Sequence, residues 1–195
     1  MNLVETLKTK YRSIDPIFDT DIYRLGYTDA DIEASLKENV FEEVKVDESL
    51  GVKCKVYTLV DYDDLFDLYT KVNSKDEQIV IKYYIGENYE YGYFTGLTLY
   101  NKIGISTQVP NICYIASSRV DKDMEIPGFY ITALKKYNSS DVYYVYLSTI
   151  INNYDKAEYN TNSIIDSLKN NIKDLSKLRN MVNISRRYIV DELFA

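Results

Sequence analysis

The sequence predicts an α+β protein in two parts, residues 1–67 and residues 68–195. Helical and alternating apolar patterns both occur along the chain, which indicates helices as well as strands. The charge also changes sign between the two parts. A chain of 195 residues suits one medium domain or two small ones, and 46% hydrophobic with 27% charged residues is typical of a globular protein.

The first part combines three helical segments with a β-hairpin. Residues 3–11 carry apolar side chains at helical spacing, and the short segment 20–25 ends at Gly26. Thr28 and Asp31 resemble a capping box, which predicts a third, longer helix. Its inner face is expected to carry Ile32, Leu36 and Val40. Alternation over 44–46 and 52–60 predicts the hairpin, and the whole is typical of a winged helix-turn-helix, which binds DNA or protein.

The second part predicts a mixed α/β domain with few long elements. An acidic helical linker over 61–69 comes first, and the β-rich run 78–85 predicts a strand. Residues 91–95 lead into a short helix over 97–103. Further strands are expected over 112–117 and 129–134, and helices over 141–153 and from Ser163 to the end. The final helix is expected to bury one apolar stripe, made of Ile165, Leu168, Ile172, Leu175, Leu178 and Val182.

The residue types present exclude most hydrolase chemistry. The chain has no His, and its two Cys, Cys54 and Cys113, are not in a CxxC pair, so zinc sites and His-dependent triads are excluded. No dinucleotide fingerprint or P-loop occurs. Carboxylate pairs do occur, but solvated turn residues explain them better than a metal-dependent nuclease, which needs a neighbouring Lys or His. We expect a non-enzymatic protein with no metal and no cofactor, and with reduced, buried thiols.

The N-terminus has no long apolar run before Glu5, Lys8 and Lys10. This excludes the apolar core of a signal peptide and a membrane-spanning segment there. We therefore expect a cytoplasmic protein with no membrane partner.

The most specific motif runs from Gly92 to Pro110, with the sequence GYFTGLTLYNKIGISTQVP, and a strand follows it. Thr95 can cap a helix, and Gly104 can end it with a positive φ. Thr107 and Gln108 can hold the following backbone, and Pro110 positions the next strand. The residues that define the motif are Gly92, Thr95, Gly96, Gly104, Thr107, Gln108 and Pro110.

This motif resembles the AbiEi-type antitoxins of type IV toxin-antitoxin (abortive infection) systems. In them a strand leads through a GY-(small)-(S/T)-G turn into a short helix and then G-(L/I)-(S/T)-T-Q-(V/I)-P. The resemblance implies an antitoxin and transcriptional autorepressor, whose winged helix binds inverted repeats in its operator and whose C-terminal domain counters a nucleotidyltransferase toxin. It also implies a monomer in solution that pairs on DNA.

The distribution of charge decides which residues can contact DNA, because phosphate contacts need cations. Residues 1–67 hold eight basic and sixteen acidic residues, net −8, whereas residues 160–190 carry a net +4. Candidate DNA contacts in the first part are Arg24, Thr28, Lys37, Lys53 and Lys55. Candidates in the second part are Lys169, Lys173, Lys177, Arg179, Arg186 and Arg187. Lys169, Lys173 and Lys177 recur every four residues, which predicts one exposed helical stripe that clamps phosphates.

Two alternatives remain open at this point. The basic stripe can be an ordinary solvated helix face. The acidic first part can instead make the chain a phage or mobile-element inhibitor that binds a host nucleic-acid-handling defence protein. A nucleotidyltransferase gene beside this one would favour the antitoxin.

Overall fold

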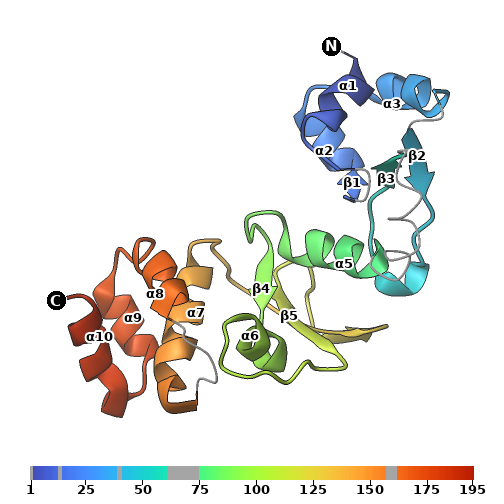
Figure 1. Ribbon diagram of the computed structural model, residues 1–195. Helices are drawn as coiled ribbons and strands as arrows, with labels where there is room; N and C mark the ends of the chain where they lie inside the picture. The colour runs from blue at the N-terminus through green and yellow to red at the C-terminus, as the bar shows by residue number, and fades with distance from the viewer. Residues whose placement is uncertain (1, 13–14, 39–40, 61–74, 157–161) are drawn as a thin grey trace. The chain divides into compact units, whose positions relative to one another are not determined.

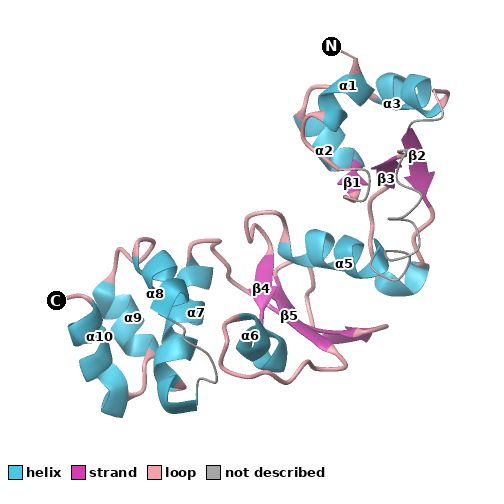
Figure 2. Ribbon diagram, viewed as in Figure 1, coloured by secondary structure: helices cyan, strands magenta, loops and turns pink. Residues whose placement is uncertain are grey.

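The computed structural model describes residues 2–12, 15–38, 41–60, 75–156 and 162–195. The chain divides into two compact units, Met1–Tyr83 (unit 1) and Tyr84–Ala195 (unit 2). Helices and strands both occur, and the described strands form one sheet in each unit (Figures 1 and 2). The predicted α+β class is confirmed. The predicted linker helix over 61–69 and the predicted boundary after residue 67 lie outside the described residues.

The described residues of unit 1 form three short helices, a three-stranded sheet and most of a longer helix. Its elements are α1 (Leu3–Lys8), β1 (Ile17–Phe18), α2 (Asp19–Arg24), α3 (Asp29–Leu36), β2 (Phe41–Val44), the 3-10 turn η1 (Glu48–Leu50), β3 (Val56–Leu59) and α5 (Lys75–Ile85). β3 lies between β1 and β2 and is antiparallel to both. The three predicted helices and the predicted hairpin are therefore present.

The core of unit 1 lies between the three helices and the sheet. Leu7 of α1, Ile22 of α2 and Ile32 of α3 are buried together with aromatic residues of the strands. The rings of Phe41 and Tyr57 stack with their centroids 5.1 Å apart. This burial explains why such short helices are stable, since isolated helices of this length are not stable in water.

The predicted cap of the third helix is confirmed in its carboxylate half. The amide and the hydroxyl of Thr28 both donate to the Asp31 carboxylate, each at 2.7 Å. These bonds, that of the hydroxyl first, lower the pKa of Asp31. The helix is shorter than predicted: it ends at Leu36, so Val40 is not on it, and Val40 lies outside the described residues.

The strand predicted over 78–85 is wrong, because these residues belong to helix α5. The buried residues Ile79, Val80, Tyr83 and Tyr84 follow helical spacing, i, i+1, i+4 and i+5. The β-branched and aromatic composition of the run favours a strand locally, and packing of this helical face overrides that preference.

The sheet of unit 2 has four strands and one helix inserted between the first two. The strands are β4 (Gly92–Phe94), β5 (Cys113–Ser117), β6 (Met124–Ile126) and β7 (Phe129–Ala133), and α6 (Gly96–Lys102) follows β4. The strand order is β4-β5-β7-β6, with β5 parallel to β7 and the other pairs antiparallel. The predicted strands around 112–117 and 129–134 are confirmed, whereas β4 and β6 are not predicted from the sequence.

The described C-terminal residues of unit 2 form the helices α7 (Asp141–Asn152), α8 (Asn162–Lys169), α9 (Leu175–Met181) and α10 (Arg187–Leu193), with the 3-10 turns η2 (Tyr154–Lys156) and η3 (Ile184–Arg186). The helix predicted over 141–153 is confirmed. The single long helix predicted from Ser163 is wrong, because the chain leaves the helix after Lys169 and a new helix begins when Asp174 caps α9. Leu178 and Val182 are buried as expected, but Leu175 is 40% exposed.

Candidate functional site

The surface formed by α2, α3 and the hairpin of unit 1 is acidic. The Tyr23 hydroxyl donates to the Asp29 carboxylate at 2.5 Å, and this bond raises the pKa of Tyr23 to about 12. Burial first, and then the carboxylates of Glu43 and Asp19, raise the pKa of Tyr57 to about 12. Carboxylates of α2, α3 and β2 therefore lie close to these two hydroxyls. Carboxylates repel phosphates and attract cations.

The candidate DNA contacts of unit 1 are exposed but do not form one cluster along α3. Arg24 ends α2, Thr28 and Lys37 flank α3, and Lys53 and Lys55 precede β3. The Thr28 hydroxyl is already donated to a carboxylate. Of these candidate contacts, the exposed residues Lys53 and Lys55 lie closest together in the sequence.

The backbone of Lys55 is also fixed in place. Its carbonyl accepts the Asp19 amide at 3.1 Å, and its amide donates to the Asp19 carboxylate at 3.4 Å. Asp19 begins α2, so these bonds hold the lysine pair beside that helix.

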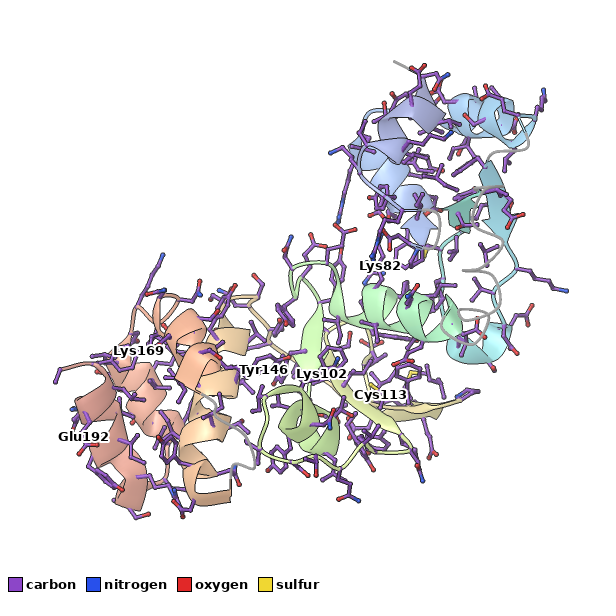
Figure 3. All side chains as sticks on the ribbon, in the orientation of Figure 1. Lys82, Lys102, Cys113, Tyr146, Lys169 and Glu192 are labelled. Carbon is purple, nitrogen blue, oxygen red and sulfur yellow. The ribbon has the colours of Figure 1, made fainter. Side chains whose placement is uncertain are left out.

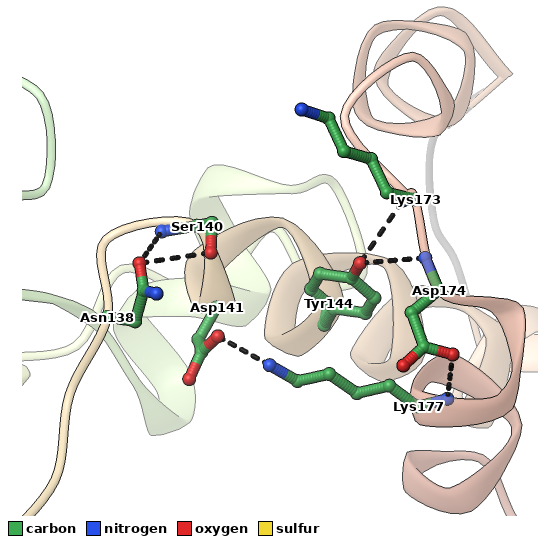
Figure 4. Close-up of polar contacts among 7 residues, drawn as sticks. All are labelled: Asn138, Ser140, Asp141, Tyr144, Lys173, Asp174 and Lys177. Atoms are coloured by element: carbon green, nitrogen blue, oxygen red, sulfur yellow. Dashed lines mark hydrogen bonds and ion pairs between the residues drawn. The ribbon is translucent and has the colours of Figure 1, made fainter.

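The basic stripe predicted for unit 2 does not exist, because the helix that would carry it is interrupted. Lys169 ends α8, Lys173 lies in the connection, and Lys177 lies in α9. α8 ends in local turn bonds, since the amides of Asn171 and Ile172 donate to the carbonyls of Leu168 and Lys169. The connection that follows is tied to α7, because the Tyr144 hydroxyl accepts the backbone amides of Lys173 and Asp174 at 3.1 and 3.0 Å (Figure 4).

Several cations of unit 2 are paired with carboxylates. The Lys177 ammonium lies 2.5 Å from the Asp141 carboxylate and 4.7 Å from the centre of the Tyr144 ring (Figure 4). Arg179 pairs with the Asp191 carboxylate. These pairs join α9 to α7 and to α10, so a phosphate would have to compete with a carboxylate at each of them.

The other candidate cations of unit 2 differ in their surroundings. Arg186 pairs with Asp155, which raises the pKa of the guanidinium. Lys169 (Figure 3) lies 5.4 Å from the centre of the Phe194 ring. Arg187 is half-buried at the start of α10, whereas Lys173 is exposed. Lys173 is therefore the most accessible of these cations.

The motif around residues 92–110 folds in part as its residues predict, but the Thr95 side chain makes no capping hydrogen bond. β4 leads into α6, Thr95 occupies the N-cap position with extended backbone, and Gly104 has φ +74° just after the helix. The predicted positive φ at Gly104 is thus confirmed. Gly92 has a different role, since a Cβ there would lie 2.0 Å from the Ala116 carbonyl oxygen of β5. Thr98 joins α6 to β5, since its hydroxyl accepts the Tyr114 amide at 2.8 Å.

Side chains that the sequence analysis does not single out fix the loop after α6. Ser106 accepts the Gln108 amide on its hydroxyl at 3.1 Å, and Asn101 donates its side-chain amide to the Ser106 carbonyl at 3.4 Å. Gln108 is exposed, and Val109 is 76% exposed. A serine two residues before the bonded amide is a known turn pattern, which is the signal that could have identified Ser106.

Tyrosine hydroxyls hold β4 and the loop before it. Tyr146 of α7 (Figure 3) accepts the Phe94 amide at 3.2 Å. Tyr137 donates to the carbonyls of Tyr89 and Gly92 at 2.6 and 3.2 Å. Burial is the main cause that raises the pKa of Tyr137 and of Tyr146. The high tyrosine content of the chain is therefore in part structural.

The described residues contain no group of three or more carboxylate or cysteine ligands placed to hold a metal ion. Cys54 and Cys113 are half-buried thiols rather than fully buried ones. No described helix combines the length and apolar character needed to cross a bilayer. Comparisons with protein-family models, with curated proteins and with solved structures find no match to this chain.

Proposed function

We propose that this chain is an AbiEi-like antitoxin that represses its own operon and counters a nucleotidyltransferase toxin. The observation that carries the proposal is the agreement of the 92–110 motif with its expected conformation. The N-cap position of Thr95, the short helix and the positive φ at Gly104 occur in the order that the antitoxin pattern implies.

The arrangement of unit 1 supports the DNA-binding half of the proposal. Its elements follow the order helix, strand, helix, helix, strand, strand, and the last strand lies between the other two. We interpret this as a winged helix, with α3 as the recognition helix and β2 and β3 as the wing. In such a domain the recognition helix enters the major groove, and the wing contacts the backbone.

The acidic surface of α3 requires that the phosphate contacts come from elsewhere in the chain. Asp29 and Glu33 are exposed on α3, with Lys37 at its end. We assign the main backbone contacts to Lys53 and Lys55, which are exposed before β3. The DNA-bound form would be a pair of chains on inverted repeats, which doubles the number of these contacts.

A promoter-reporter assay in cells tests the repressor half. We expect the full chain to repress its own upstream region, and the double variant Lys53→Glu, Lys55→Glu to lose that repression. The matched control is Lys135→Glu, Lys136→Glu, which reverses two exposed lysines of unit 2. Equal repression by both variants would reject the assigned surface.

Co-expression tests the antitoxin half. The proposal predicts a nucleotidyltransferase gene beside this one, and the chain should restore growth when that toxin is induced. The Lys53, Lys55 double variant should retain this ability because neutralisation is assigned to unit 2. A toxin that still arrests growth in the presence of the folded chain would contradict the proposal.

One observation favours a second candidate, an acidic inhibitor that binds a nucleic-acid-handling protein. Asp29 and Asp19 both act on the hydroxyls of Tyr23 and Tyr57, and Glu43 acts on Tyr57, so carboxylates gather near the surface that we assign to DNA. This candidate predicts no repression of the reporter and competition with DNA for the partner. The variant Asp29→Lys, Glu43→Lys of this chain should no longer compete, so that the partner binds DNA in its presence, and this result would support the second candidate.

A further inference from the structure

Three side chains form a row on one face of the unit 2 sheet. Tyr114 of β5 lies directly opposite Tyr130 of β7, and Tyr130 lies directly opposite Glu125 of β6. Residues paired in this way project to the same face of a sheet. The tyrosine rings have their centroids 6.1 Å apart and are tilted by 47°. We call Tyr114, Tyr130 and Glu125 the tyrosine row.

The tyrosine row is not part of the hydrophobic core. Tyr130 is 36% exposed, Glu125 is exposed and Tyr114 is half-buried. The neighbouring strand residues Ile115 and Ile131, which project to the opposite face, are fully buried. The row lies on the other face, which is covered at Ala116 but reached by solvent at Tyr130 and Glu125.

The row is negative, and its central tyrosine is held in place. Glu125 is the one charged residue among the described strand residues of this sheet, and residues 121–126 carry a net charge of −2. The Tyr130 hydroxyl donates to the Asp123 carboxylate at 3.4 Å, and Asp123 also accepts the Ala133 amide at 2.8 Å. These bonds orient the ring and limit the entropy lost when a ligand stacks on it.

We propose that the tyrosine row binds an arginine side chain of a partner protein. The face of an aromatic ring attracts a cation, and a carboxylate beside it supplies an ion pair with the same group. A planar guanidinium can stack on Tyr130 while it pairs with Glu125, which a lysine ammonium cannot do equally well. This site is independent of the surface that we assign to DNA, because it lies in unit 2 and takes a cation.

A peptide titration followed by NMR tests the site on the full chain. The probe is a tripeptide with arginine between two glycines and both ends blocked, and the control peptide carries citrulline, which has a similar shape but no charge. We expect saturable shifts of the Tyr114 and Tyr130 ring signals with the arginine peptide and none with citrulline. A lysine peptide should bind more weakly.

Variants separate this site from general attraction to an acidic protein. Tyr130→Leu and Glu125→Gln should each weaken binding about 2- to 5-fold, the fold-change expected for one exposed cation–π contact or ion pair. Tyr188→Leu is the matched control, since Tyr188 of α10 is 59% exposed. Equal shifts with citrulline, equal weakening by the control variant, or shifts confined to unit 1 would each overturn the proposal.

Discussion

Replacing Lys82 of α5 by methionine should destabilise unit 1 strongly. The Lys82 ammonium (Figure 3) lies 2.7 Å from the Asp21 carboxylate and donates to the Pro16 carbonyl at 2.8 Å. The side chains of Lys82 and Asp21 are only 13% and 12% exposed. Removing one member of a buried pair costs about 3 kcal/mol or more, because the other charge stays buried without compensation. Methionine keeps most of the volume, so packing contributes little to the loss.

Hydrogen exchange, read separately on peptides of the two units, measures this loss without a two-state assumption for the whole chain. A loss of about 3 kcal/mol should speed the slowest amides of unit 1 by roughly 100-fold. The control Arg12→Met removes an exposed pair with Asp15, in which the Arg12 side chain is 78% exposed, and should change the rate by less than about 5-fold.

A double variant tests the assigned cause. Asp21→Asn removes the charge but keeps an oxygen that can accept the Phe18 amide, as Asp21 does at 3.1 Å. Adding it to Lys82→Met should therefore recover part of the lost stability. The reasoning is refuted if Lys82→Met is no worse than Arg12→Met, or if the double variant is less stable than Lys82→Met.

Three further predictions concern single positions. Gly92→Ala should destabilise unit 2 by about 2 kcal/mol or more in urea unfolding, since its Cβ would meet the Ala116 carbonyl, and an unchanged midpoint would contradict this. Gly104→Val should cost a few kcal/mol by the same assay, because its φ is +74°, and unaltered melting would mean that the position tolerates a branched residue. Thr28→Ala should raise the lowered pKa of Asp31 in an NMR titration. A carboxylate with a lowered pKa adds stability that is present at pH above its ordinary pKa and is lost as the pH falls through the lowered pKa. In the variant this contribution should already be lost at a higher pH, and an unshifted titration of Asp31 would contradict the prediction.

The sequence is most informative where one or two residues determine a local conformation. Thr28 and Asp31 mark the start of α3, and Gly104 marks the end of α6, because capping and positive φ depend on the residues themselves. The path of the connection between α8 and α9 cannot be predicted in this way. The Tyr144 hydroxyl, which comes from another helix, accepts the amides of Lys173 and Asp174 there.

The same distinction applies to the candidate site. The basic residues near the C-terminus can be identified from the sequence, but their partners cannot, because Asp141 is 36 positions from Lys177 and Asp155 is 31 positions from Arg186. Only the fold brings these charges together. The tyrosine row is hidden for the same reason, since its three members come from three strands whose register the sequence does not reveal.

The most direct test of the antitoxin and repressor proposal is a binding titration of the purified full chain. It is measured on the DNA upstream of its own gene and on scrambled DNA of equal length, at two salt concentrations. The proposal predicts specific binding to the upstream DNA that weakens as salt rises, because phosphate contacts release counterions. Absence of binding at low salt, or equal affinity for the scrambled DNA, would contradict it.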